Sequence, residues 1–211
     1  MKKLYLDIET LPAPRELHKI LHEIHQKSVD DGKKVKTIEE YIEQTSFNGA
    51  FGRIACISYA VNDGKVTTLS GDEKKILRDF WDIAADVTLF IGFNIMNFDM
   101  RFIYQRSIIL GVEPTQDLNF ARYRNMPIYD IMQEWNKWDF QSHINLDALA
   151  KAMGLLSSKC GEIEGKNVAQ AYEMGKIAEI CKYCESDVEV TRKIYKKMIF
   201  DNGKVLDVIN F

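Results

Sequence analysis

A strand-like segment near the start of the chain constrains the fold more than any other feature. In the stretch KLYLDIETLP, residues 3–12, apolar side chains recur at every second position, which is the period of a β-strand. These apolar side chains therefore share one face, while Asp7 and Glu9 lie together on the other. A Leu-Pro dipeptide then ends the pattern, because proline cannot donate a hydrogen bond within a sheet. The sequence predicts a strand that buries one face and carries two carboxylates near its end.

The two carboxylates admit two interpretations. They repel each other, and removing either one from water costs free energy. They can form the solvated end of a strand that leads into a turn. They can also bind a divalent cation, which turns their repulsion into attraction. Two carboxylates are too few to hold such an ion, so a metal site requires further acids elsewhere in the chain.

The remaining hydrophobic pattern predicts a sheet covered by helices. The expected strands cover residues 53–61, 65–70 and 87–94. The expected helices cover residues 71–86, 98–110, 146–154 and 178–198. Residues 112–145 have weaker periodicity and no expected strand or helix. This order predicts an α/β (α+β) fold with a mixed β-sheet flanked by α-helices.

Length and composition favour a single domain. The chain has 211 residues, of which 46% are hydrophobic and 28% charged, so it can bury one substantial core. We predict one domain over residues 1–200, with a helical insertion after the first strand at 13–46 and a C-terminal tail at 201–211. No apolar run approaches the roughly 20 residues that cross a bilayer, and no signal-peptide pattern follows the first lysines. We therefore expect a cytoplasmic location and no membrane partner.

Cysteine and histidine spacings suggest other metal sites, which we do not favour. Cys181 and Cys184 form a C-x-x-C pattern, but no second pair completes a tetrahedral zinc site. Cys56 lies within an apolar run and is expected in the core, so we favour reduced thiols over zinc or redox chemistry. Three histidines of the insertion share one helix face, where a polar stripe is the favoured reading; they are His18, His22 and His25.

Two later segments supply the further acids. Asp99 follows the strand that ends in GFN and precedes a helix, where it can line a cleft at the sheet edge or stabilise the helix N-terminus. Asp187 lies four residues after Tyr183, so both occupy one face of the last helix. That pair can also be structural, with Asp187 meeting a lysine. If all four acids converge, their oxygens can bind two Mg²⁺ or Mn²⁺ ions about 4 Å apart.

The order of these motifs resembles a known group of nucleases. LDIET, GFNIMNFD and YCESD are similar to the three exonuclease motifs of the DEDD (DnaQ-like) superfamily, which has the ribonuclease H-like fold. A tyrosine four residues before the last aspartate resembles its DEDDy branch. The segments GRIACISYAV, DIMQEW and LDALAKAMG further resemble bacterial predicted 3′–5′ exonucleases related to the proofreading domain of family-B DNA polymerases.

The resemblance implies a role for each matching residue. The implied metal ligands are Asp7, Glu9, Asp99 and Asp187. The implied substrate-binding residues are Thr10, Leu11, Asn94 and Phe98. Tyr183 would act on the attacking water, and its usual pKa of about 10 favours orientation over proton abstraction. Arginines that can contact phosphates on charge grounds, although most are expected to be surface residues, are Arg101, Arg106, Arg122 and Arg124.

The expected function is therefore two-metal-ion 3′–5′ exonuclease activity. It would hydrolyse phosphodiester bonds at the 3′ ends of single-stranded DNA or RNA and release nucleoside monophosphates. One alternative is a catalytically silent nucleic-acid-binding domain, and another is a proofreading subunit that acts in trans with a polymerase or repair partner. The net charge of −3 argues against a broad basic face for duplex DNA but not against binding a short end around metal ions.

Overall fold

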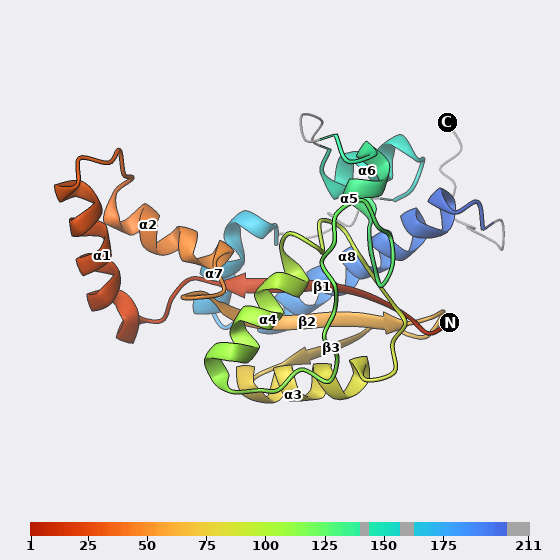
Figure 1. Ribbon diagram of the computed structural model, residues 1–211, viewed down its shortest axis with the longest axis horizontal. Coiled ribbons are helices and arrows are strands. Elements are labelled where there is room, and N and C mark those ends of the chain that lie inside the picture. The colour runs from red at the N-terminus through yellow and green to blue at the C-terminus, as the bar shows by residue number, and fades with distance from the viewer. Residues whose placement is uncertain (140–143, 157–162, 202–211) are drawn as a thin grey trace.

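The computed structural model describes residues 1–139, 144–156 and 163–201, and its centre is a five-stranded sheet (Figure 1). The strands are β1 (Lys3–Leu11), β2 (Arg53–Val61), β3 (Thr67–Ser70), β4 (Leu89–Gly92) and β5 (Ile128–Asp130). Their order is β3-β2-β1-β4-β5, with β1–β2 and β2–β3 antiparallel and β1–β4 and β4–β5 parallel. The predicted mixed sheet is therefore confirmed.

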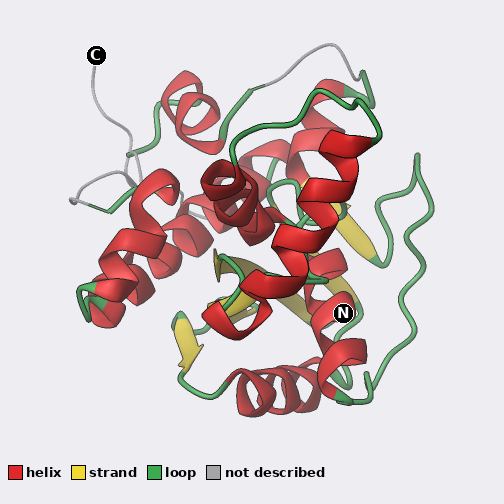
Figure 2. Ribbon diagram, turned by 90° about the vertical axis from the view of Figure 1, so that its left-hand side faces the viewer, coloured by secondary structure: helices red, strands yellow, loops and turns green. Residues whose placement is uncertain are grey.

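Helices cover both faces of this sheet. The α-helices are α1 (His18–Asp30), α2 (Ile38–Gln44), α3 (Glu73–Ala84), α4 (Asp99–Leu110), α5 (Ile131–Asn136), α6 (Leu146–Ala152), α7 (Val168–Glu173) and α8 (Ile177–Met198). The short 3₁₀ helices are η1 (Arg15–Leu17), η2 (Thr45–Phe47) and η3 (Gly165–Asn167). Figure 1 shows α4 in front of β1 and β2 and α8 behind them, and Figure 2 shows the strands enclosed between helices. No described helix is long and apolar enough to cross a membrane.

The alternating pattern of β1 divides the core between the two faces. Leu4, Leu6 and Ile8 join one cluster with the buried sides of α3 and α4, including the fully buried Phe80. On the other face, Tyr5 packs with apolar residues of α8. The face that carries Asp7 and Glu9 is therefore the one that α8 covers. The strand period thus brings the N-terminal carboxylates beneath the C-terminal helix.

The sequence pattern missed β5 and α5. A strand of three residues is too short to establish a period, and it lies in a segment that is rich in turn-forming residues. Asp130 ends this strand and caps α5 by accepting hydrogen bonds from the backbone of Met132 and Gln133. The same carboxylate accepts hydrogen bonds from the backbone N–H groups of Asn94 and Met96. Asp130 therefore fixes the loop that leads from β4 to α4.

The insertion after β1 forms helices, as predicted. It contains η1, α1, α2 and the start of η2, and Figure 1 shows α1 and α2 extending beyond the end of the sheet. Thr37 caps α2 in a reciprocal capping box with Glu40. The Nε2–H of His25 donates a hydrogen bond to the carbonyl of Lys36, and its ring contacts Tyr41, so it joins the two helices rather than a metal site.

Candidate active site

Asp7 and Glu9 occupy the same face of β1, directly below α8. Glu9 is 9% exposed and pairs across the sheet with Cys56 of β2, and the register shifts immediately after it. The Cys184 thiol donates a hydrogen bond to the Asp7 carboxylate over 3.3 Å, and this contact joins α8 to β1. This register shift interrupts the regular pairing, which resumes at Thr10 and Leu11; such irregularities are common next to functional sites.

Asp99 also contacts β1, although it comes from a much later segment of the chain. It is the first residue of α4, only 3% exposed, and its carboxylate accepts a hydrogen bond from the backbone N–H of Ile8 over 3.1 Å. Ile8 lies between the two N-terminal acids. Asp99 is therefore both a helix N-terminal acid and a neighbour of the β1 carboxylates, so the two sequence interpretations of this residue are compatible.

Asp187 and Tyr183 complete the cluster from α8. Asp187 is 7% exposed on the inward face of the helix, and the Tyr183 side chain one turn earlier makes a hydrogen bond with it. Asp187 also interacts electrostatically with Asp7, Glu9 and Asp99. The structure thus brings the four acids and the tyrosine together from β1, α4 and α8.

The electrostatics show the cost of this convergence. Burial, negative charge on Cys184 and the charges of the other three acids raise the pKa of Asp7 well above its usual range. Burial and the charges of Cys184, Asp187 and Asp99 do the same for the pKa of Glu9. Burial is also the main cause that raises the pKa of Asp99 to about 7, against backbone hydrogen bonds that lower it. A buried cluster of acids is unfavourable unless protons or cations neutralise it. Its carboxylate oxygens are the ligands that hard divalent cations require, so the donor set fits Mg²⁺ or Mn²⁺.

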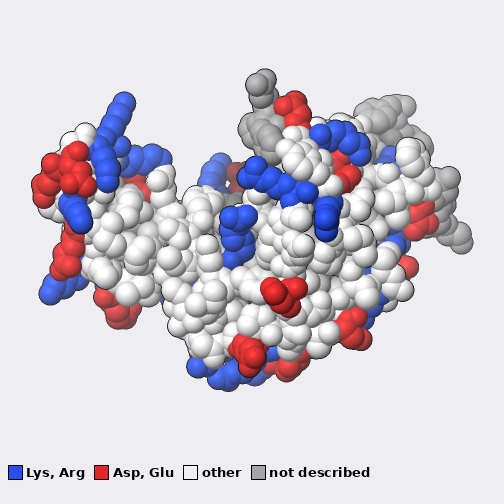
Figure 3. All heavy atoms as spheres, in the orientation of Figure 1, with Lys and Arg blue, Asp and Glu red and all other residues white. Residues whose placement is uncertain are grey.

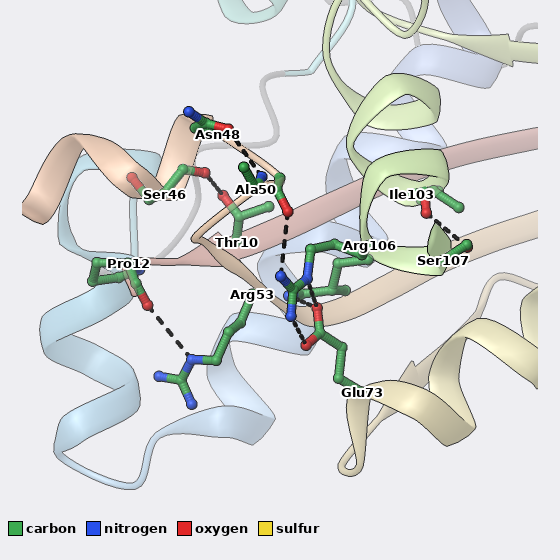
Figure 4. Close-up of polar contacts among 12 residues, drawn as sticks. Thr10, Pro12, Ser46, Asn48, Ala50, Arg53, Glu73, Ile103, Arg106 and Ser107 are labelled. Carbon is green, nitrogen blue, oxygen red and sulfur yellow. Dashed lines mark hydrogen bonds and ion pairs between the residues drawn. The ribbon is translucent and has the colours of Figure 1, made fainter. Parts of the chain in front are cut away.

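The residues expected to bind substrate have different environments. The Thr10 hydroxyl donates a hydrogen bond to the carbonyl of Ser46, at the end of the insertion (Figure 4). Leu11 is only 3% exposed and packs in the core beneath α7 and α8. Asn94 is partly exposed and has a positive φ of 59°, with its side-chain oxygen accepting a hydrogen bond from Asn97.

Phe98 belongs to an aromatic surface that sequence reasoning did not find. Its ring centroid lies 6.2 Å from that of Phe47 in η2 and 5.7 Å from that of Phe102 in α4. These rings and Arg101 line a shallow cavity of about 250 Å³. Phe47 is 74% exposed, so its ring is accessible to a ligand. No local pattern could reveal this pairing, because Phe47 and Phe98 come from distant segments.

The phosphate-contact hypothesis is wrong for Arg106. Its guanidinium is 5% exposed and donates two hydrogen bonds to the Glu73 carboxylate, over 2.8 and 2.9 Å (Figure 4). It also donates to the carbonyl of Gly49, and Glu73 accepts from the backbone of Ile54. This buried ion pair joins the segment after the insertion to α3 and α4. Arg106 therefore supports the fold, whereas Arg101, Arg122 and Arg124 are exposed.

Comparisons with known proteins agree with this geometry. A family model described as "Predicted 3′-5′ exonuclease related to the exonuclease domain of PolB" matches residues 46–208. No curated protein matches the chain. The structure of the family B DNA polymerase from the hyperthermophilic archaeon Pyrobaculum calidifontis is similar to 95% of this chain, with a TM-score of 0.67 and 15% sequence identity. The chain spans only 24% of that polymerase. The likeness confirms the predicted ribonuclease H-like fold.

Proposed function

Because the chain belongs to the family of predicted 3′–5′ exonucleases related to the exonuclease domain of PolB, we propose that it shortens single-stranded nucleic acids from their 3′ ends. The family match confirms the resemblance read from the motifs. The proposed products are nucleoside monophosphates. The observation that carries this proposal is the convergence of four carboxylates and Tyr183 at one site. We also propose that residues 1–200 act as one domain with the 13–46 insertion; the 201–211 tail lies outside the described residues except for Asp201.

Each group of the cluster has a distinct proposed task. Asp7, Glu9, Asp99 and Asp187 would hold two Mg²⁺ or Mn²⁺ ions. Bound there, such ions supply positive charge at the phosphodiester and lower the pKa of the attacking water. Burial and the charges of Asp187, Glu9 and Asp7 raise the pKa of Tyr183 far above its usual value, so its phenol stays protonated at neutral pH. The phenol has a single proton, which its hydrogen bond with Asp187 uses. To orient a water or phosphate oxygen by donation, it would exchange that hydrogen bond for one to the oxygen.

The direct test uses 5′-labelled single-stranded DNA and RNA oligonucleotides in parallel. We expect a ladder of products that shorten from the 3′ end when Mg²⁺ or Mn²⁺ is present, and no shortening in EDTA. The comparison of the two ladders identifies the preferred nucleic acid. Binding of the oligonucleotide without any metal-dependent shortening would instead support a silent binding domain.

The stability of the metal-free protein should decrease as pH rises. The folded protein keeps a proton on Asp99 up to about pH 7, whereas the unfolded chain releases it near pH 4. The stabilisation from that proton is complete below about pH 4 and is lost as pH rises toward 7. Divalent metal should therefore raise Tm more at pH 8 than at pH 5.5, because protons compete for the same oxygens. Thermal scans with Mn²⁺, and with KCl at matched ionic strength as the control, test this; an equal rise at both pH values would contradict it.

The aromatic surface around Phe98 is the proposed site for nucleobases next to the cleft. Phe47→Ala should weaken single-strand binding by about 1–3 kcal/mol, because an exposed ring beside Phe98 provides a stacking surface that tolerates any base. Fluorescence anisotropy with labelled oligonucleotides measures this loss. Phe200→Ala is the matched control, since Phe200 is 84% exposed and follows the C-terminal end of α8. Equal affinities for the two variants would show that Phe47 does not contribute to binding.

The insertion is the proposed cover for the entering strand. Its exposed basic residues are Arg15, Lys19, Lys27, Lys33, Lys34 and Lys36. Figure 3 shows that acids are interspersed with them at the end of the molecule where α1 and α2 lie, so a purely solvated surface remains the alternative. At the base of the insertion, the backbone N–H of Ala13 donates a hydrogen bond to the Thr45 hydroxyl. A variant that shortens the insertion should therefore keep both of these residues.

Replacing residues 16–42 with a short Gly-Ser linker keeps this base and removes all of these basic residues except Arg15. Single-strand affinity should decrease and its dependence on salt should become shallower, because fewer counterions are released on binding. Turnover at saturating substrate should stay within a few-fold, because no residue of the carboxylate cluster is removed. Affinity measured at several salt concentrations checks this. A folded variant with unchanged affinity and salt slope would show that the insertion does not contact the strand.

A further inference from the structure

Three cysteines converge beside the carboxylate cluster, although only two of them form a sequence pattern. Cys181 and Cys184 lie one turn apart on α8, and Cys56 comes from β2. Cys56 and Cys184 lie in one buried cluster and Cys181 packs against it, and interaction with each of the two α8 thiols raises the pKa of Cys56. All three are free thiols. The expectation that Cys56 is a buried core residue is confirmed, but the fold also makes it the partner that the C-x-x-C pattern lacked.

The three thiols differ in their access to solvent. Cys56 and Cys184 are fully buried, whereas Cys181 is partly exposed. Cys56 pairs across the sheet with Ser70 on one side and with Glu9 on the other. Ser70 is exposed on the edge strand β3, and its side chain makes a hydrogen bond with Cys181. Cys181 therefore lies at the solvent-facing edge, with Cys56 directly behind it on the way to the carboxylates.

The hydrogen bonds assign different reactivities to this pair. The hydrogen bond with Cys56 is the main cause that lowers the pKa of Cys181 to about 7, so part of this thiol is ionised at neutral pH. Hydrogen bonds with Cys181 and Cys184, together with burial, raise the pKa of Cys56. A thiolate, and not a thiol, is the nucleophile in reactions with oxidants. An accessible thiolate next to a second thiol is the arrangement in which oxidation ends in a disulfide.

We propose that Cys181 is an oxidation site for hydroperoxides and that Cys56 converts the product into a disulfide between α8 and β2. The Cys181 thiolate attacks one peroxide oxygen, the O–O bond breaks, and the departing hydroxide takes up a proton to become water. Cys181 is then a sulfenic acid. Cys56 attacks its sulfur, the S–O bond breaks, and the hydroxide leaves as water with the Cys56 proton. Two thiols lose two electrons and two protons, and one peroxide becomes two waters.

The cross-link would act on the neighbouring site. Cys181 precedes Tyr183 by two residues on α8, and Cys56 is paired with Glu9 on β1. Bonding the two sulfurs shortens their separation and moves the helix relative to the strands that carry the acids. Displacements of about 1 Å can cost 10²-fold in rate. This consequence rests on the proposed function: oxidised protein should hydrolyse single strands at least about tenfold more slowly, and dithiothreitol should restore the rate.

The experiment first identifies which thiols are oxidised and then measures the rate of hydrolysis. The fourth cysteine, Cys160, lies outside the described residues and is replaced by Ser in every sample. After treatment with a small excess of hydrogen peroxide, the intact mass should fall by about 2 Da, and digestion should yield one peptide pair linked through Cys56 and Cys181. Cys56→Ser should instead accumulate a sulfenic acid at Cys181 that dimedone traps. Cys181→Ser should resist oxidation, and peroxide treatment should leave its hydrolysis rate unchanged.

The outcomes separate this proposal from the proposed function. A disulfide between Cys181 and Cys184, or first oxidation at Cys184, would overturn the assignment of the pair. An unchanged mass under conditions that oxidise a free thiol peptide would overturn the oxidation site itself. Mapping on the protein with Cys56 and Cys181 intact does not depend on whether either variant folds. A cross-linked protein that is inactive even after reduction would support the thiol pair and contradict the exonuclease proposal.

Discussion

Asp187→Asn is expected to reduce nucleotide release by more than about 10³-fold, and Asp7→Asn should do the same. Each substitution keeps the size of the side chain but removes one of the charges that we propose hold the divalent cations. The effect should appear in turnover at every substrate concentration, because the lost interaction acts on the reacting phosphate and not on the remainder of the strand. Single-turnover release from a labelled oligonucleotide measures it without interference from product dissociation.

The same substitutions should not destabilise the metal-free protein. The other acids raise the pKa values of Asp7 and Glu9, and Asp187 also raises that of Asp99, so removing one charge relieves repulsion within the cluster. The Tm in EDTA should therefore stay the same or rise, while the additional stabilisation by Mn²⁺ should become smaller. Loss of activity together with a lower Tm in EDTA would indicate damage to the fold instead of loss of a ligand.

Glu189→Gln is the matched control for these variants. Glu189 lies two residues after Asp187 on α8, but its carboxylate accepts hydrogen bonds from Arg192 and is part of the helix surface. The control makes the same chemical change on the same helix and removes a partly exposed ion pair outside the cluster. Its hydrolysis rate should remain within about twofold of the unsubstituted protein. A large loss in this control would show that negative charge on α8, and not the cluster, determines the rate.

The sequence was sufficient where a local period determines the structure. The two-residue period of β1 placed Asp7 and Glu9 on one face, and the helical period of α8 placed Tyr183 and Asp187 on one face. Two of the helices, α3 and α8, have amphipathic patterns, and their predicted extents agree with the structure to within a few residues. The predicted extent of α4 agrees equally well, although its pattern is less amphipathic. Local periods could not show that the acids meet; that expectation came from the resemblance of the ordered motifs.

The features that sequence reasoning missed depend on contacts between distant segments. From the sequence, Arg106 is expected to be a surface cation, but in the structure it forms an ion pair with Glu73 of another helix. From the sequence, Cys56 is expected to be one more apolar residue of β2, but in the structure it packs with the cysteines of α8. The β5 strand forms because β4 offers an unpaired parallel edge, and its three residues carry no period of their own. In each case the decisive partner is far away in the sequence, so no window along the chain contains the signal.

Tyr183→Phe is expected to slow hydrolysis by about 10²-fold while leaving metal binding nearly unchanged. Phenylalanine preserves the aromatic packing on α8 and removes only the hydroxyl, which is the group proposed to orient an oxygen at the reacting phosphate. The stabilisation of the variant by Mn²⁺ should match that of the unsubstituted protein, because all four carboxylates remain. The loss should appear in kcat with KM nearly constant, since the strand contacts are unaltered.

The pH dependence distinguishes orientation from proton abstraction. Burial, the largest cause, and three neighbouring acids hold the pKa of Tyr183 above its usual value, so the phenol carries its proton at neutral pH. The pH–rate profiles of the two proteins should therefore have the same shape, with the variant lower throughout. If Tyr183 removed the proton from water, the rate of the unsubstituted protein would keep rising toward alkaline pH and the variant would lack that rise. Tyr172→Phe, at a partly exposed position of α7 outside the cluster, should leave both kcat and the profile unchanged.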